Sequence, residues 1–346
     1  MREKMAKKIL ITGGAGFIGS NYACRRILNG DDVTIYDNLS RRGAKENLEW
    51  VSSKTNDKSF VFTEGDVRDY EMLTSVVGGK DIIIHLAAQV AVTSSVADPQ
   101  FDFSVNAAGT FNVLEAARIC GEKPLVIYSS TNKVYGEIDD IPVVEEETRY
   151  SFKNLPNGVS ENQLLDFHSP YGCSKGCGDQ YVKDYSRIYD IPTVVFRQSC
   201  IYGKRQFGIE DQGWVAWFVI AAVAGKPITI YGDGKQVRDL LFIDDLMNAY
   251  DLAIERKEDV KGLIFNIGGG MENSVSIWRE FGPILEKNHE KEIPVDFKEW
   301  RPGDQKIYIS DISKIKDYLG WSPEISVEKG LSLLYQWVVE NKRLFA

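Results

Sequence analysis

The stretch "ITGGAGFIGS", residues 11–20, decides the fold that we expect for this chain. Gly13, Gly16 and Gly19 form a GxxGxxG pattern between an apolar run at residues 7–12 and a helix-like run at residues 17–29. Glycines at such a junction let the backbone turn tightly and approach a diphosphate, while the N-terminus of the next helix offers N–H groups and a partial positive charge. The pattern therefore predicts a strand, a glycine turn and a helix that together hold a dinucleotide.

The same alternation of strand and helix continues through the first two hundred residues. Further apolar runs lack strict alternation of polar and apolar residues, as parallel strands do when helices cover both faces of their sheet. They lie at residues 32–38, 59–67, 81–88, 124–131 and 192–199. Helices are predicted between them, so we expect an α/β fold with a Rossmann-type doubly wound parallel sheet.

The sequence changes character after about residue 200. A buried helix is predicted at residues 214–225, a hairpin with a glycine-rich turn at 226–239, and further helices at 244–256 and 326–342. We expect a dinucleotide-binding domain over residues 1–199 and a smaller C-terminal α+β lobe for the substrate over residues 200–346. The boundary is blurred, because one or two of the later segments can return to the main sheet.

Composition excludes several classes of protein. A formal net charge of −9 argues against non-specific binding to nucleic acids or anionic membranes. No stretch approaches the ~18 uninterrupted apolar residues of a membrane-spanning helix, and the basic and then apolar start has no signal-peptide cleavage site. The 5 cysteines have no zinc-site spacing, which favours reduced thiols. We expect a cytoplasmic protein without nucleic acid, membrane or metal as a partner.

Acidic residues after the second and third strands bear on the choice of dinucleotide. Asp37 ends the second strand, where a carboxylate can accept hydrogen bonds from the adenosine ribose and would repel a 2'-phosphate. This favours NAD over NADP, although Arg41 and Arg42 follow closely and leave that preference open. Asp66 ends the third strand and either contacts the adenine or caps the next helix.

The stretch "YGCSK" carries the catalytic signal. Tyr171 and Lys175 are four residues apart on a predicted helix and therefore share one face. We expect the ammonium to favour the phenolate and lower the pKa of the tyrosine toward the working pH. A second match, Tyr231 to Lys235, lies in the glycine-rich turn, where the two side chains share no helical face, and we assign it no catalytic role.

These motifs together resemble the extended short-chain dehydrogenase/reductase superfamily, in particular its sugar-nucleotide epimerases and dehydratases. The resemblance runs essentially from end to end. Its landmarks are "TGGAGFIG", "YDNLS", "EGDVRD", "HLAAQ", "VNAAGTFNVLEAAR", "YSSTNKVYG", "SPYGCSKG", "GDGKQVRDLLFIDD" and "RPGDQ". The resemblance implies that Tyr171 is the acid/base, that Lys175 is its partner and that Thr131 completes a catalytic triad.

The resemblance also implies NAD as the cofactor and a set of ligand contacts. The cofactor residues are Gly13, Gly16, Phe17, Ile18, Gly19, Asp37, Asn38, Ser40, Arg41, Asp66, Val67, Leu86, Ala87, Ala88, Gln89, Ser129, Tyr171 and Lys175. The substrate residues are Thr131, Asn132, Gln198, Arg238 and Arg301. Both arginines resemble diphosphate contacts of the family. Surface salt bridges with Asp239 or Asp304 are the alternative for them.

The residues after Thr131 decide which reaction the resemblance implies. In relatives that eliminate water an acidic pair follows this hydroxyl, and decarboxylases carry a glutamate one place further on. Asn132 and Lys133 stand here, and neither can do the work of a carboxylate. An alcohol that is oxidised by NAD and then reduced again remains, so we expect an epimerase.

Within the family, the resemblance is strongest to enzymes that invert C2 of a CDP-linked 3,6-dideoxyhexose through a 2-keto intermediate. "SSTNKVYG", "LLDFHSPYGCSKG", "DQGWVAWF" and "GKQVRD" carry it, and Cys200 stands where UDP-galactose 4-epimerases usually have an asparagine. The alternatives are a UDP-sugar 4-epimerase and a protein that binds NAD without turnover. Family members commonly pair through the helices after the fourth and fifth strands, so we expect a homo-oligomer.

Overall fold

The computed structural model describes residues 6–55, 60–301 and 304–345, which form two interleaved compact units. The first comprises Met1–Thr131, Ser169–Phe196 and Tyr250–Ile264, and the second Asn132–His168, Arg197–Ala249 and Phe265–Ala346. A single cut between residues 199 and 200 therefore does not separate the units. The physical reason is that strands β8 (Thr193–Gln198) and β12 (Leu263–Ile267) and helix α9 (Ile243–Glu255) begin in one unit and end in the other.

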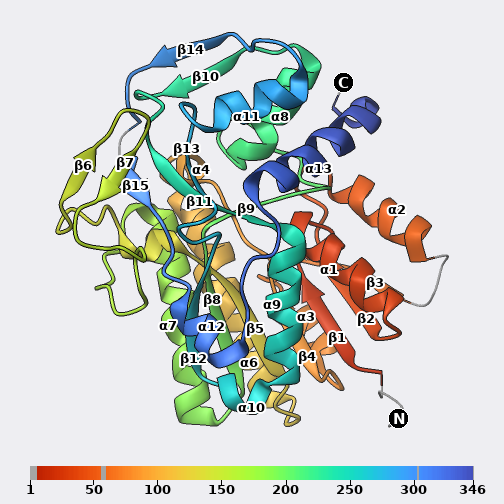
Figure 1. Ribbon diagram of the computed structural model, residues 1–346. Coiled ribbons are helices and arrows are strands. Elements are labelled where there is room, and N and C mark those ends of the chain that lie inside the picture. The colour runs from red at the N-terminus through yellow and green to blue at the C-terminus, as the bar shows by residue number, and fades with distance from the viewer. Residues whose placement is uncertain (1–5, 56–59, 302–303, 346) are drawn as a thin grey trace. The chain divides into compact units, whose positions relative to one another are not determined.

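The first unit is built around a seven-stranded sheet in the order β12–β8–β5–β4–β1–β2–β3 (Figure 1). β1 pairs in parallel with β2 and β4, β2 with β3, and β4 with β5. The strands are β1 (Lys8–Thr12), β2 (Asp32–Asp37), β3 (Phe60–Glu64), β4 (Ile82–His85) and β5 (Leu125–Thr131), with β8 and β12 as above. The predicted doubly wound parallel sheet is confirmed, and β12 is a later segment that returns to it.

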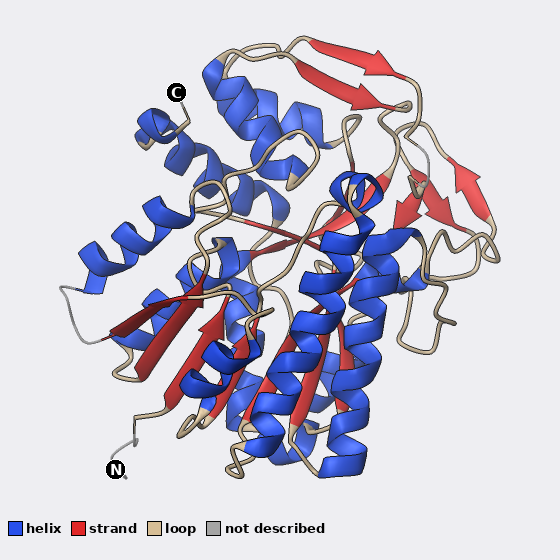
Figure 2. Ribbon diagram, turned by 180° about the vertical axis from the view of Figure 1, so that it is seen from behind, coloured by secondary structure: helices blue, strands red, loops and turns tan. Residues whose placement is uncertain are grey.

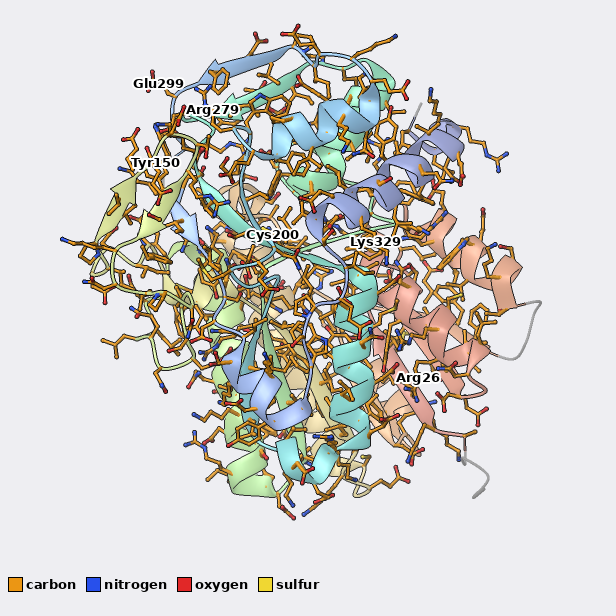
Figure 3. All side chains as sticks on the ribbon, viewed as in Figure 1. Arg26, Tyr150, Cys200, Arg279, Glu299 and Lys329 are labelled. Carbon is orange, nitrogen blue, oxygen red and sulfur yellow. The ribbon has the colours of Figure 1, made fainter. Side chains whose placement is uncertain are left out.

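Helices cover both faces of this sheet. Figure 2 shows the long helices in front of the strands, and the core on this face joins α3, α6 and α7 to the sheet through side chains such as Leu73, Leu114 and Val182. Arg26 of α1, labelled in Figure 3, lies on the other face. It makes 2.7 Å ion pairs with Asp31 and with Asp251 of α9. The helices of this unit are α1 (Phe17–Leu28), α2 (Ala44–Thr55), α3 (Tyr70–Val77), α4 (Val92–Ala97), α5 (Pro99–Phe103), a π-helix (Ser104–Ala108), α6 (Gly109–Ile119), α7 (Ser169–Tyr189) and α10 (Lys257–Val260).

The second unit contains small sheets and several helices. β11 is central to a four-stranded sheet with β9, β13 and β15, while β10 pairs with β14 and β6 with β7. The strands are β6 (Val143–Glu145), β7 (Tyr150–Phe152), β9 (Cys200–Tyr202), β10 (Ile228–Tyr231), β11 (Val237–Phe242), β13 (Ser274–Ser276), β14 (Val295–Lys298) and β15 (Ile307–Tyr308). The helices are a 3₁₀ turn (Asn132–Tyr135), α8 (Trp214–Ala224), α11 (Phe281–His289), α12 (Ser313–Leu319), α13 (Val327–Glu340) and a 3₁₀ turn (Lys342–Leu344).

The hairpin expected at residues 226–239 is wrong. β10 and β11 do not pair with each other, because all six residues of β11 are buried and its backbone is used by β9, β13 and β15. Gly232 and Gly234 have positive φ between the two strands and turn the chain away. Tyr231 ends β10 and Lys235 lies in the loop that follows, so this YxxxK match has no shared helical face, as predicted.

The part of the chain that the structure describes has neither a membrane-spanning helix nor a metal-binding cluster. None of its helices is both long and apolar enough to cross a membrane. Its histidines, cysteines and acidic residues form no group of three or more that could hold a metal ion. All five cysteines are free.

Replacing Gly19 by alanine tests how closely the start of α1 packs against the glycine turn. The added methyl group would collide with the carbonyl oxygen of Gly13 and lie 2.6 Å from the Cα of Gly14. We expect Gly19→Ala to lower the free energy of unfolding by about 1–3 kcal/mol in urea denaturation. Gly78→Ala is the control, since no atom lies within 4 Å of its new methyl group. Equal stability of the two variants would contradict this account.

Candidate active site

The glycine turn after β1 brings together backbone segments that leave no room for a side chain. Gly13 has a φ of +68°, and a Cβ there would lie 2.7 Å from the backbone nitrogen of Ala87. Gly13 N donates to the carbonyl of Tyr36 at 2.8 Å. Among the described residues no side chain caps α1, so the N–H groups at Phe17 and Ile18 stay available to an anion. This cradle fits the diphosphate of a dinucleotide.

Asp37 fixes this turn from the end of β2. Its carboxylate accepts hydrogen bonds from the backbone nitrogens of Ala15 at 3.0 Å and Leu39 at 2.8 Å. Burial raises the pKa of Asp37, and these hydrogen bonds oppose that shift. Asn38 Oδ1 accepts from the nitrogen and the hydroxyl of Ser40 at 3.1 and 2.7 Å. A carboxylate has about four acceptor positions, so Asp37 keeps capacity for ribose hydroxyls.

Asp66 is held by an arginine and does not cap a helix. Arg68 donates to both of its carboxylate oxygens, at 2.9 and 2.8 Å, and Asn38 Nδ2 donates at 2.8 Å. The hydrogen bonds from Arg68 lower the pKa of Asp66 to about 2. Asp69 caps α3 by accepting from Met72 N at 3.0 Å. Asp66 therefore stays ionised beside the end of β2, and its adenine contact remains a prediction.

The segment Leu86–Gln89 after β4 is braced by Asn106, which the sequence interpretation did not single out. Asn106 Oδ1 accepts from Gln89 N at 2.9 Å, and its Nδ2 donates to Gln89 O at 3.0 Å. The same Nδ2 lies 3.0 Å from Asp102 Oδ1 and 3.1 Å from Ser174 Oγ. Asn106 belongs to the π-helix, and such turns often occur at functional sites. The sequence signal, an asparagine inside "SVNAAGT", is weak without this geometry.

Thr131, Tyr171 and Lys175 meet within the first unit. Thr131 ends β5, while Tyr171 and Lys175 lie one turn apart on α7, where Ser95 Oγ accepts from Tyr171 N at 3.1 Å. A side-chain hydrogen bond joins Thr131 to Tyr171. Lys175 Nζ donates to the carbonyl of Ser129 at 2.6 Å. The structure thus brings together the three residues predicted to be catalytic.

The protonation of this triad differs from the expectation. Burial raises the pKa of Tyr171 to about 12, against a lowering by the hydrogen bond with Thr131. Burial lowers the pKa of Lys175 to about 7, although Asp179 and Asp102 favour the charged form. The expected lowering of the Tyr171 pKa is therefore wrong when only the groups of the protein itself act on it. Loss of hydration outweighs the neighbouring charges, and Lys175 directs its ammonium to the Ser129 carbonyl.

Two cations gather around Gln305 in the second unit. Arg238 Nη2 donates to the Gln305 carbonyl at 2.8 Å, and Lys133 Nζ donates to Gln305 Oε1 at 3.2 Å. Arg238 also forms a 3.2 Å ion pair with Asp304, the alternative that the sequence left open. Burial and then Arg238 lower the pKa of Lys133 to about 8. Lys133 was not predicted as a binding residue; its only signal is its place two residues after Thr131.

Arg301, Asn132 and Gln198 are the other substrate residues that we predicted in the second unit. The Arg301 guanidinium lies 3.8 Å from the centre of the Tyr231 ring and forms a 2.9 Å ion pair with Asp211. This acidic partner is neither of the two that the sequence suggested. Asn132 and Gln198 are both buried, with 8% of each exposed. The contacts of all three with a substrate remain predictions.

Comparisons with known proteins find relatives over nearly the whole chain. The family model described as GDP-mannose 4,6 dehydratase matches residues 10–334. A CDP-paratose 2-epimerase of Salmonella typhi is 45% identical over 337 residues, which cover 95% of this chain and 98% of that protein. The crystal structure of a Thermotoga maritima UDP-glucose 4-epimerase with UDP-glucose has a TM-score of 0.82 and 31% identity, and covers 97% of this chain and 99% of its own. A Bacillus cereus UDP-glucuronic acid 4-epimerase, solved with UDP-glucuronic acid and NAD, has a TM-score of 0.82 and 31% identity over 96% and 99% of the two chains.

The buried Lys175 predicts a pH dependence of stability. Its pKa is about 7 in the folded chain and 10.5 normally, so between these values the unfolded chain binds more protons. The free energy of unfolding must then rise with pH in this window, by up to about 1.4 kcal/mol per pH unit. We expect urea denaturation to show this rise for the wild type relative to Lys175→Met between pH 7.5 and 9.5. Parallel pH profiles for the two proteins would contradict the assignment.

Proposed function

Because this chain belongs to the GDP-mannose 4,6 dehydratase family, we propose that it is an NAD-dependent epimerase that converts CDP-paratose to CDP-tyvelose by inverting C2. The similarity to the Salmonella typhi CDP-paratose 2-epimerase, 45% over nearly the whole of both chains, carries the choice of substrate. The grouping of Thr131, Tyr171 and Lys175 at the ends of β5 and α7 supports the choice of reaction.

The residues beside Thr131 support epimerisation rather than elimination of water. A dehydratase needs an acid for the departing hydroxyl and a base for a neighbouring proton. Asn132 has no titratable side chain and Lys133 is not a carboxylic acid, so neither can do the work of the acidic pair of a dehydratase. The keto sugar is therefore reduced again without elimination.

The proposed cofactor is NAD, which when bound accepts a hydride from the sugar carbon and returns it. The glycine turn and the first turn of α1 would hold its diphosphate, and Asp37 its adenosine ribose. Tyr171 would take the proton from the C2 hydroxyl and give it back, with Thr131 orienting the reacting oxygen. Lys175 would hold the nicotinamide ribose and favour the tyrosinate.

The proposed substrate carries its negative charge on a diphosphate. Arg238 and Lys133 converge on Gln305 and offer a guanidinium fork and an ammonium to such a group. A nucleotide anchored in this way leaves the sugar free to present both faces of a 2-ketone. A 3,6-dideoxy sugar has few hydroxyls that would restrain this rotation.

A UDP-sugar 4-epimerase is the alternative within the same family. A putative UDP-glucose 4-epimerase of Methanocaldococcus jannaschii is 35% identical over 97% of this chain. Against this alternative, Cys200 stands where such enzymes usually have an asparagine, and its thiol is held neutral by burial, which raises its pKa. Substrate specificity separates the two functions directly.

We also propose that the protein is a cytoplasmic homo-oligomer. Large apolar side chains are exposed on α5, α6 and α7 of the first unit; they are Phe103 (59%), Phe111 (42%), Tyr181 (45%) and Ile188 (65%). A second copy of this helical face is the occupant that would cover them. Sedimentation analysis of the wild type and of Phe111→Glu tests the assignment.

Tyr171→Phe tests the catalytic role with the loss of a single oxygen. We expect the variant to fold and bind NAD, with turnover reduced ~10²–10⁴-fold because general acid–base catalysis is lost. Tyr189→Phe is the matched control, since it removes one hydroxyl from a tyrosine at the other end of α7 that is 42% exposed. Near-normal activity of Tyr171→Phe would end the proposed mechanism.

Isotope labelling at C2 tests the reacting carbon. The substrate is CDP-paratose carrying deuterium at C2, and the product is analysed by NMR. We expect the deuterium to stay at C2 of CDP-tyvelose without exchange, because the hydride returns to the carbon that it left. Loss of deuterium to water would indicate proton abstraction instead. Inactivity on every CDP-sugar, with rapid epimerisation of UDP-galactose, would favour the 4-epimerase.

A further inference from the structure

The ammonium of Lys175 lies on the face of a buried aromatic ring. Its Nζ is 4.2 Å from the centre of the Tyr128 ring, while the same nitrogen donates to Ser129 O at 2.6 Å. Tyr128 is fully buried and Lys175 is 4% exposed. A cation in such a site has lost most of its hydration, so the negative face of a ring replaces part of it.

The ring of Tyr128 is clamped in this orientation. His85 is its neighbour across β4 and β5, with the two ring centres 5.5 Å apart and the planes 29° from parallel. At the hydroxyl end of the ring α7 approaches so closely that a Cβ at Gly178 would lie 2.5 Å from the Tyr128 oxygen. The ring therefore cannot swing away from Lys175 without displacing β4 or α7.

The neighbouring His85 stays neutral, so it does not repel the ammonium. Its Nδ1 lies 2.7 Å from Thr12 Oγ1 and its Nε2 lies 3.0 Å from Thr110 Oγ1. Burial and then the charge of Lys175 lower the pKa of His85 to about 3. Both ring nitrogens of this core histidine therefore have hydrogen-bond partners.

Charged and titratable groups from each surrounding element also face Lys175. Asp179 is fixed by a 2.8 Å hydrogen bond from Ser130, and Asp102 by Asn106. Among the residues that the structure describes, these groups are Asp179 and Tyr171 on α7, Asp102 on α5, His85 on β4 and Tyr128 on β5. The pKa of Lys175 is about 7 within this set, so a small energetic change alters its charged fraction at neutral pH.

We propose that Tyr128 is a positioning residue, whose aromatic face holds the side chain of Lys175 in its charged form beside the Ser129 carbonyl. The proposal rests on the proposed function, in which charged Lys175 assists Tyr171. Tyr128 itself touches neither substrate nor cofactor in this role. Its contribution is the electron-rich ring, so the ring rather than the hydroxyl is the feature to vary.

The test keeps the ring in place and weakens its negative face. Tyr128→Phe is followed by mono-, di- and trifluorophenylalanine at the same position in the full-length protein. The pKa of Lys175 is read from the Cε chemical shift in ¹³C-lysine-labelled protein, with the resonance assigned by Lys175→Arg. We expect Tyr128→Phe to keep the wild-type value, and the pKa to fall stepwise by about 0.5–1.5 units across the fluorinated series.

The same fluorinated series at Tyr185 is the matched control. Tyr185 belongs to the same core and lies on α7, but its ring contacts Phe111, Tyr181 and Tyr189. We expect the Lys175 pKa to stay constant there. A constant value through the Tyr128 series, or an equal fall in both series, would overturn the proposal.

Activity provides a second readout. The alkaline limb of the kcat/KM profile, which reports pKa values of the free enzyme, should move to lower pH by the same amount as the Lys175 pKa across the Tyr128 series. An unmoved limb would show that the ring does not serve turnover. Because the NMR titration needs no substrate, a failed Tyr171→Phe prediction and a failed Tyr128 series remain distinguishable.

Discussion

The packing of helix α7 against strand β5 is the contact on which the proposed catalytic set depends. Ser130 on β5 donates to Asp179 on α7, and Gly178 lets the helix lie against the Tyr128 ring without a side chain between them. This approach carries Lys175 to the Ser129 carbonyl and Tyr171 to the Thr131 hydroxyl. A side chain at position 178 would push α7 away from β5 and separate these pairs, because a hydrogen bond weakens steeply as its distance grows.

Burial shifts the two catalytic groups in opposite directions. The pKa of Tyr171 rises to about 12 and that of Lys175 falls to about 7, since both charged forms lose hydration. Each pKa unit corresponds to about 1.4 kcal/mol, so burial works against both charged forms. A ligand that brings positive charge to this site favours the tyrosinate, but it also opposes the ammonium of Lys175. The arrangement couples proton transfer to occupancy of the site.

The chain passes from one compact unit to the other between Thr131 and Asn132. The hydroxyl of Thr131, proposed to be catalytic, therefore belongs to the unit with the parallel sheet, whereas the next two residues belong to the unit that holds Arg238 and Gln305. Lys133 donates to Gln305 in that second unit, which supports its proposed contact with the substrate diphosphate. The short stretch "SSTNK" thus serves both parts of the proposed reaction.

The sequence by itself determined the parallel sheet, the glycine turn after β1, and the shared helical face of Tyr171 and Lys175. These features follow from local periodicity and from the backbone freedom of glycine, which act over a few residues. Only the tertiary structure decided the partners of β10 and β11, the ion pairs of Arg238 and Arg301, and the bracing role of Asn106. It also reversed the expected pKa shift of Tyr171. The physical reason is that hydration and charge around a group depend on residues far away in the chain, as Asp102, Tyr128 and Lys175 show.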